Sequence, residues 1–126
     1  MLQEAVPLQG DDLWHAAAGF GGGFAGCGDA CGALTGALMA MGFAEGQKAA
    51  REGRVSDRVK SRVRVYCDEF LARFGSVDCQ VLSGYLLRDD EQYRAFKSGN
   101  TKRERCYRYV EFAIRRSLDL VERDDV

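Results

Sequence analysis

Cysteine is the residue type in this 126-residue chain that most clearly suggests chemistry. The five cysteines are Cys27, Cys31, Cys67, Cys79 and Cys106. The first twelve residues do not resemble an export signal, and cytosolic reductants keep structural thiols reduced, so we expect no permanent disulfide framework. The thiols are therefore expected to be buried, to be redox-active or to bind a metal.

The spacing of the cysteines leaves two kinds of site open. No Cys-x-x-Cys pair occurs, which removes the strongest zinc signature, and no Cys-x-x-Cys-His sequence offers covalent haem attachment. Cys27 and Cys31 lie four residues apart, so a helix would place both sulfurs on one face. With Cys79 and Cys106 they make four candidate metal ligands, enough for an iron–sulfur cluster or a zinc ion. Without a metal, the same thiols could form a redox dithiol.

A helix start is expected close to Cys31. With Gly28 or Asp29 as the N-cap, Cys31 falls in the first helical turn, where unpaired N–H groups and the helix dipole favour a thiolate. The neighbouring carboxylate of Asp29 acts in the opposite direction.

Two other cysteines are expected in comparable places. Cys79 lies near another predicted helix start, and Cys106 comes one turn after Lys102 and Arg103, whose charges favour a thiolate. We predict that three catalytic thiols from different helices converge, with Cys27 as the candidate fourth: Cys31, Cys79 and Cys106.

Cys67 and His15 are expected to be structural. Cys67 lies in the middle of an apolar stripe, where cysteine is usually a small core residue. His15 is the only histidine and is expected to be partly buried with one hydrogen bond. It could serve as a base for a thiol only if the fold brings it to Cys31.

Glycine is concentrated around the first two cysteines, with ten of the fifteen glycines between positions 19 and 46. Gly28, Gly32, Gly36 and Ala40 recur at steps of four, which on a helix forms a flat groove. Each interior glycine costs a helix up to about 1 kcal/mol relative to alanine, so the pattern needs a reason. The groove could seat another helix, or it could bring Gly28, Gly32 and Gly36 against a cofactor.

The glycine run does not predict a nucleotide site. A formal G-x-G-x-x-G occurs at Gly21, Gly23 and Gly26, but no strand precedes it and no acidic residue on a second strand completes it. The sequence also has no Gly-Lys-Ser/Thr of a P-loop.

Beyond Gly53 the apolar residues follow a helical period. Residues 56–74 carry a stripe at steps of three and four, made of Val59, Val63, Cys67, Phe70 and Phe74. Ser56 is the expected N-cap and Gly75 the expected stop. The apolar residues Val63, Val65 and Cys67 alternate with their neighbours, which also fits a short strand. The length of the segment and the flanking arginines favour a helix.

Shorter helices are expected on either side of this one. One runs through residues 13–20 with an acidic cap at position 11 or 12. Another runs through residues 77–87 and is capped by Ser76 or Asp78. Residues 89–100 are expected to form a polar connection with at most one helical turn.

The last helix begins at a capping box formed by Thr101 and Glu104. Its predicted inner face comprises Cys106, Val110, Ala113, Ile114, Ser117 and Val121. We therefore predict an all-α single domain over residues 1–126, a compact bundle of four or five helices in which the glycine-rich helix is central.

Charge and hydropathy exclude several functions. The net charge of -1 comes from 18 basic and 19 acidic residues, so no overall field attracts nucleic acid or an anionic membrane. The charge-free run 30–44 is too short and too rich in glycine to cross a bilayer, which takes about 20 apolar residues. We expect a cytoplasmic protein that binds no nucleic acid, inserts into no membrane, reacts with an unidentified redox partner and is able to form homo-oligomers.

Several motifs together resemble one protein family. The segment CGALTG at residues 31–36, preceded by GFGGG and followed by ALMAMG, is similar to the central motif of the C_GCAxxG_C_C family, small helical proteins to which redox activity is ascribed from their cysteines. FGSVDCQVLSG, ending at Gly84, resembles the third cysteine segment of the family. CYRYVEFA, beginning at Cys106, resembles the fourth. Together these segments cover most of the chain between residues 14 and 113.

The resemblance implies that Cys31, Cys79 and Cys106 are family cysteines and that the domain is redox-active. The first family cysteine lies in an N-terminal helix, and here MLQEAVPLQ resembles a shortened form of that helix with Leu2 at the cysteine position. Cys27 or Cys67 could take the vacant role. A likeness to the N-terminal part of split-Soret cytochromes c keeps an iron–sulfur site open. The alternatives to thiol exchange or electron transfer are thus a non-catalytic iron–sulfur or zinc protein and a structural, oligomer-forming helical domain.

Overall fold

The computed structural model describes residues 12–52 and 55–122, which are almost entirely helical and confirm the all-α prediction. Along the chain the elements are α2 (Asp12–Ala16), a 3-10 turn η1 (Ala18–Phe20), α3 (Gly21–Phe24), α4 (Gly32–Glu52), α5 (Val55–Phe74), α6 (Cys79–Ser83), α7 (Asp90–Ser98), a π-helical turn η2 (Lys102–Cys106) and α8 (Tyr107–Glu122). Within these two ranges the one β-pairing is an isolated antiparallel bridge between Ala30 and Asp78.

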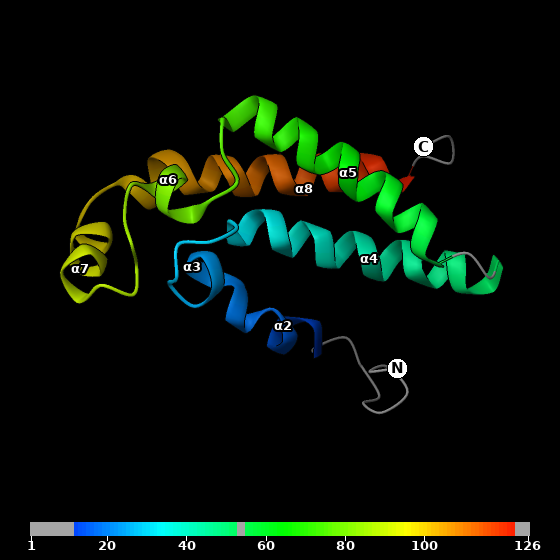
Figure 1. Ribbon diagram of the computed structural model, residues 1–126, viewed down its shortest axis with the longest axis horizontal. Helices are drawn as coiled ribbons and strands as arrows, with labels where there is room; N and C mark the ends of the chain where they lie inside the picture. The colour runs from blue at the N-terminus through cyan, green and yellow to red at the C-terminus, as the bar shows by residue number, and fades with distance from the viewer. Residues whose placement is uncertain (1–11, 53–54, 123–126) are drawn as a thin grey trace.

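Three long helices, α4, α5 and α8, form the body of the protein (Figure 1). α4 contacts both α5 and α8, which also contact each other. The shorter α2, η1 and α3 lie along one side of α4, and α6 and α7 lie toward one end of the bundle (Figure 1). The glycine-rich helix is therefore central, as predicted.

The core of the bundle is largely aromatic. Side chains from α5 and α8 form a cluster with ring centroids 4.8 to 6.1 Å apart, made of Tyr66, Phe70, Phe74, Tyr109 and Phe112. α4 and the residue before it cover this cluster with smaller side chains, Cys31, Leu34, Ala37 and Met41. Many buried contacts of this kind supply most of the stability of amphipathic helices in a bundle.

The inner face of α5 differs from the predicted stripe. Arg62, Tyr66 and Phe70 are fully buried, whereas Val63 and Cys67 lie half-buried beside them. Arg62 can be buried because its guanidinium lies 3.0 Å from a carboxylate oxygen of Glu45 and donates to the carbonyl of Leu120. The helix also includes Ser56, so Ser56 is not its N-cap, whereas Gly75, with φ +80°, ends the helix as predicted.

The start of α8 also differs from the prediction. Thr101 has helical backbone angles and its side chain caps nothing, so the predicted capping box with Glu104 does not form. Instead the chain makes the π-helical turn η2 before the regular helix begins.

The inner face of α8 is rotated relative to the predicted one. Ala113 and Ser117 are buried as predicted, but Tyr109 and Leu120 complete the buried face, while Val110 and Ile114 are exposed. These two side chains line an apolar groove of about 350 Å³ between α8 and the small residues of α4.

The predictions for two shorter segments, residues 77–87 and 89–100, were wrong in part. α6 ends at Ser83 because Gly84 takes a left-handed conformation with φ +82°, so the helix is shorter than the predicted 77–87. Residues expected to form a polar connection form α7, whose N-cap Asp89 accepts a hydrogen bond from the amide of Gln92. An N-cap of this kind is worth about 1 kcal/mol, enough to favour a helix in a polar segment.

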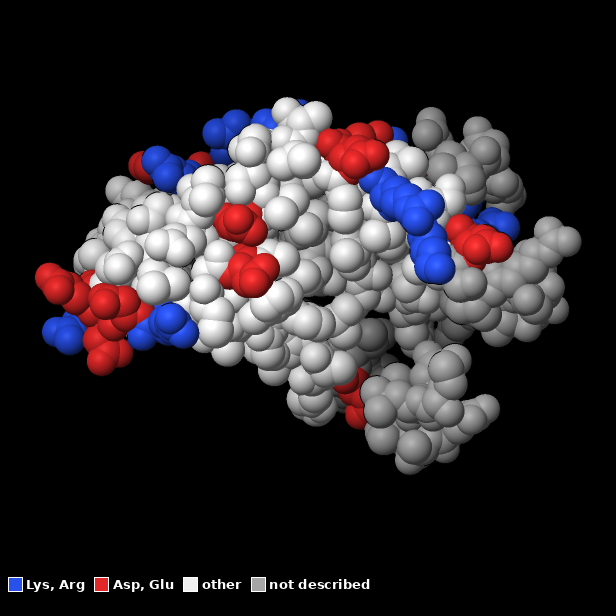
Figure 2. Space-filling model, in the orientation of Figure 1, with Lys and Arg blue, Asp and Glu red and all other residues white. Residues whose placement is uncertain are grey.

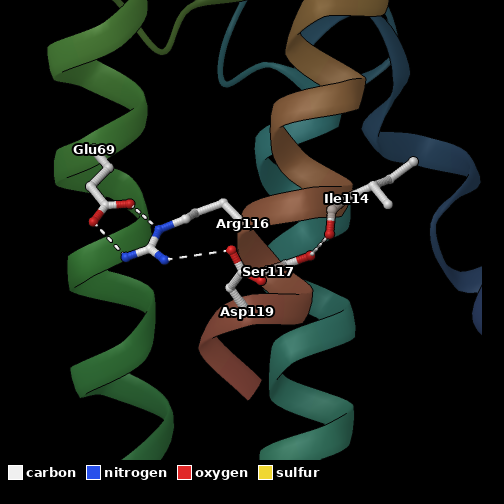
Figure 3. Close-up of polar contacts among 5 residues, drawn as sticks. All are labelled: Glu69, Ile114, Arg116, Ser117 and Asp119. Atoms are coloured by element: carbon white, nitrogen blue, oxygen red, sulfur yellow. Dashed lines mark hydrogen bonds and ion pairs between the residues drawn. The ribbon is translucent and has the colours of Figure 1, made fainter. Parts of the chain in front are cut away.

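An ion pair joins α5 to α8. The guanidinium of Arg116 binds both carboxylate oxygens of Glu69, with the Nη2 to Oε1 distance at 2.8 Å, and lies 3.9 Å from Asp119 (Figure 3). The hydroxyl of Ser117 donates to the carbonyl of Ile114 on the same helix. Because the Glu69 and Arg116 side chains remain 39% and 22% exposed, the pair is partly hydrated.

The surface carries charges of both signs. On the face shown in Figure 2, acidic and basic side chains lie together over α7, and the surface beside them is mostly uncharged but carries acidic side chains near its middle. Among the described helices, none is long and apolar enough to span a membrane.

Candidate functional site

Two helix starts meet at the bridge between Ala30 and Asp78. Two hydrogen bonds of 2.7 Å flank this pair, one from the amide of Cys31 to the carbonyl of Val77 and one from the amide of Cys79 to the carbonyl of Asp29. Cys31 directly precedes α4, and Cys79 is the first residue of α6. Each cysteine comes one residue after a member of the bridged pair. Because side chains alternate between the two faces of extended backbone, Cys31 and Cys79 are expected on the face opposite to Ala30 and Asp78, diagonally across from each other.

Cys31 is the N-cap of α4. The amide of Thr35 donates the first intrahelical hydrogen bond to the Cys31 carbonyl at 3.0 Å. The prediction that Gly28 or Asp29 caps this helix is wrong, because the bridge keeps the backbone extended through Ala30. Cys31 is 9% exposed and lies at the positive end of a 21-residue helix, the end that favours a negative charge.

A left-handed glycine loop holds α6 against the start of α4. Positive φ angles occur at Gly22, Gly23, Phe24, Ala25, Gly26 and Gly28. The resulting turn directs the carbonyls of Gly28 and Asp29 at the first two amides of α6. Gly23 is buried in this turn at φ +67°, and a Cβ atom there would lie 2.8 Å from the Cβ of Cys79. The glycines therefore build the backbone support of the two cysteines.

Cys106 reaches the same region from the far end of the chain. It is the last residue of η2, which contacts α6. One turn later, the buried hydroxyl of Tyr109 donates to the carbonyl of Leu82 in α6 at 2.9 Å. This hydrogen bond fixes the start of α8 against α6. π-helical turns often occur at functional sites, and this one sets where Cys106 lies relative to the inner face of α8.

The thiols of Cys31, Cys79 and Cys106 interact electrostatically. Burial raises the pKa of Cys106, and the nearby thiols of Cys31 and Cys79 raise it further, while Lys102 and Arg105 act in the opposite direction. Burial also raises the pKa of Cys79, which the Ser83 hydroxyl lowers and Cys31 raises. The predicted effect of Lys102 on Cys106 is thus present, but burial outweighs it.

The other two cysteines differ in exposure and surroundings. Cys27 is exposed in the glycine loop. Cys67 is half-buried on α5 against the core, and burial raises its pKa. All five thiols are free. His15 is exposed at the end of α2, so the expectation that it is partly buried is wrong.

A structural metal ion needs several donor side chains that converge on one point. Over residues 12–52 and 55–122, no group of three or more His, Cys, Asp and Glu side chains is arranged to hold a metal ion. The free thiols can therefore react through their sulfur atoms, but in the described residues they are not arranged as a set of metal ligands.

The three glycines considered for cofactor contact have different surroundings. Gly28 precedes α4 at φ +77°, so it is not part of a helical stripe with Gly32 and Gly36. A Cβ atom at Gly32 would lie 3.3 Å from the carbonyl oxygen of Phe20, which shows that α4 packs closely on η1 here. Gly36 has open space beside it and lines the apolar groove. The close-packing interpretation thus holds at Gly32.

Sequence reasoning missed two buried polar features of the bundle. One is the Tyr66 hydroxyl, which is fully buried and has no hydrogen-bond partner. The other is the charged cluster of Glu45, Arg58 and Arg62. No motif marks either one, because a tyrosine or an arginine in a helix is ordinarily expected at least partly in water.

The sequence matches one protein family over most of its length. Residues 1–120 match the model of the family described as "Putative redox-active protein (C_GCAxxG_C_C)". The chain belongs to this family. No curated protein and no solved structure matches the chain. The segment around Leu2, where the first family cysteine would be, lies outside the described residues.

The exposure and pKa shifts of the cysteines predict an order of alkylation. A thiol with a raised pKa carries less thiolate at a given pH, so Cys79 and Cys106 should react with iodoacetamide several-fold more slowly than exposed Cys27 at pH 7. Their rates should rise as the pH passes the usual thiol range. Peptide mapping by mass spectrometry measures each site. Equal rates at pH 7 in folded protein would contradict the described burial.

Proposed function

We propose that this protein is a redox-active thiol protein that exchanges disulfides through Cys31 and Cys79, with Cys106 as a third participating thiol. The observation that carries the proposal is the bridge that joins the starts of α4 and α6, because it makes the two cysteines diagonal neighbours. Membership of a family described as redox-active supports the same class of chemistry.

The exposure of the two thiols suggests the order of steps. Half-buried Cys79 attacks one sulfur of an external disulfide as a thiolate, and the departing external thiolate takes a proton. The Cys31 thiolate then attacks the Cys79 sulfur, which forms the Cys31–Cys79 disulfide and releases the second external thiol. The external disulfide gains two electrons and two protons, and the protein dithiol loses them. The reverse sequence oxidises an external dithiol.

The surroundings of Cys31 suit the second step. It lies at the N-cap of α4, where the helix dipole favours a negatively charged sulfur. Its burial shields the sulfur from competing reagents. The thiols of Cys31 and Cys79 both raise the pKa of Cys106, which supports a role for Cys106 as the acceptor of the disulfide in a further exchange. Transfer of the two electrons onward then requires a partner dithiol or disulfide.

The test uses Cys31→Ser with Cys67→Ser as its matched control. Treated with a mild external disulfide, the wild type and the control should each lose the thiols of Cys31 and Cys79 as an internal disulfide, besides a mixed disulfide at exposed Cys27, and should regain all of them on reduction. Cys31→Ser should instead stop at the mixed disulfide, found by mass spectrometry at Cys79. We expect its release of the second external thiol to fall at least a hundredfold, because the attacking sulfur is absent.

Several outcomes would overturn the proposal. One is a wild type that forms no internal disulfide and whose Cys31 and Cys79 resist alkylation in the folded state. Another is a Cys31→Ser variant that releases the second external thiol at the wild-type rate. Anaerobic protein that contains stoichiometric zinc, or iron and sulfide, lost on the same substitution, would favour the metal-binding alternative instead.

A further inference from the structure

A cleft of about 300 Å³ is lined by residues of α5 and α8. Its lining is rich in arginine: Arg73 comes from the last turn of α5, and Arg108, Arg115 and Arg116 come from α8. Two acidic residues and one phenylalanine of α8 complete the lining in the described part of the chain. The cleft therefore carries more positive than negative charge.

Two of the four arginines already have carboxylate partners. Arg116 binds both carboxylate oxygens of Glu69 and lies 3.9 Å from Asp119 (Figure 3). The Nη2 atom of Arg115 lies 2.9 Å from the Oε1 atom of Glu111. Both acidic residues of the lining are thus engaged with these two guanidiniums. An anion that enters the cleft would have to compete with these carboxylates for Arg115 and Arg116.

Arg73 and Arg108 are the other two positive charges of the cleft. Within residues 12–52 and 55–122, neither guanidinium forms an ion pair with a carboxylate. The guanidinium carbon of Arg73 lies 5.6 Å from the ring centroid of Phe74 and 5.7 Å from that of Phe112. Such cation–π contacts hold the guanidinium in place without cancelling its charge. Arg108 lies one turn before Phe112 on α8, so the two side chains share a face of that helix.

We propose that this cleft binds a small phosphate monoester, whose phosphate is held by Arg73 and Arg108. The fork of N–H donors of a guanidinium matches pairs of phosphate oxygens, which is why arginine is common in phosphate sites. A phosphate monoester carries a charge of about -1.5 to -2 at pH 7. This charge matches two guanidiniums that have no acidic partner, whereas a single carboxylate would neutralise only one of them.

The size and lining of the cleft restrict the organic part of the ligand. A volume of about 300 Å³ is at the lower end of the range for small-molecule pockets, so the ester is compact. Phe112 is half-buried and offers an apolar contact to the group that carries the phosphate. The inference does not rest on the proposed function, because none of the described lining residues is a cysteine.

The test titrates the full chain with phenyl phosphate, which joins a phosphate monoester to one aromatic ring. Isothermal titration calorimetry at pH 7 and low salt measures its affinity. Inorganic phosphate lacks the ring, and benzoate carries only one negative charge. We expect phenyl phosphate to bind at least tenfold more tightly than either compound, and its affinity to fall as the salt concentration is raised.

Three substitutions locate the site. Arg108→Gln removes an exposed guanidinium without an ion pair, and should weaken binding about tenfold, as loss of a hydrogen bond to a charged group predicts. Arg73→Lys keeps the positive charge but loses the planar fork, and should weaken binding severalfold. Arg94→Gln removes the same charge from α7, outside the cleft, and should bind like the wild type. Thermal unfolding of each variant shows whether its fold is intact.

Three results would each overturn the inference. The first is a wild type that shows no saturable binding of phenyl phosphate. The second is an Arg108→Gln variant that binds phenyl phosphate as tightly as Arg94→Gln does. The third is binding of benzoate or inorganic phosphate as tight as that of phenyl phosphate. If Arg73→Lys proves unstable, Arg108→Gln decides the question by itself. None of these results bears on disulfide exchange, which is measured separately through Cys31→Ser.

Discussion

Glu45→Gln should lower the free energy of unfolding by about 3–5 kcal/mol, the usual effect of removing one partner from a buried ion pair. The Glu45 carboxylate is fully buried, 2.5 Å from the Nε of Arg58 and 3.0 Å from the Nε of Arg62. Arg62 is also fully buried, so the substitution takes the negative charge of Glu45 away from a buried guanidinium. Urea unfolding followed by circular dichroism measures the change.

Glu69→Gln is the matched control for this prediction. It makes the same chemical change at the ion pair with Arg116, where both side chains are partly exposed (Figure 3). Water can solvate the remaining guanidinium, so the expected loss is about 1 kcal/mol or less. Equal losses at the two positions would show that Glu45 and Arg62 are hydrated in solution.

Gly23→Ala should lower the free energy of unfolding by about 2–5 kcal/mol, from the combined effects of left-handed backbone strain and overpacking. The residue has φ +67°, and an added Cβ would lie 2.5 Å from the amide nitrogen of Asp29 and 2.8 Å from the Cβ of Cys79. The clash falls on the loop that holds the two cysteines. Cys79 should therefore become more reactive toward iodoacetamide as the loop separates from α6.

Gly42→Ala provides the comparison. It lies inside α4 with no atom within 4 Å of an added Cβ and no positive φ, so alanine should stabilise the helix by up to about 1 kcal/mol and leave cysteine reactivity unchanged. Denaturant unfolding and alkylation rates of both variants are measured side by side. A Gly23→Ala variant as stable as the wild type would mean that the loop is not held against Cys79 as described.

Predictions from sequence were most accurate where a local pattern decides the structure. The stop of α5 at Gly75 follows from a glycine that can take a left-handed conformation after an apolar stripe. The all-α class follows from the helical period beyond Gly53. α7 was missed because its single cap at Asp89 outweighs a polar composition that predicts a loop.

Errors about which face is buried have a different origin. The predicted stripe of α5 did not include Arg62, since an arginine is usually solvated, yet Glu45, seventeen positions earlier, and the carbonyl of Leu120 provide its partners. In α8, the Tyr109 hydroxyl reaches the carbonyl of Leu82, so the buried face includes position 109 in place of 110. Both cases depend on partners that are distant in the sequence.

The sequence by itself determined the helical class, the family and which cysteines lie in family motifs, because periodicity and motif spacing are local properties of the chain. Only the tertiary structure decided that the starts of α4 and α6 are joined at Ala30 and Asp78, and that the Tyr66 hydroxyl is buried without a partner. A bridge between segments 48 positions apart depends on how the glycine loop turns and on what the three long helices bury. Such pairings are set by packing of the whole chain, and no local pattern encodes them.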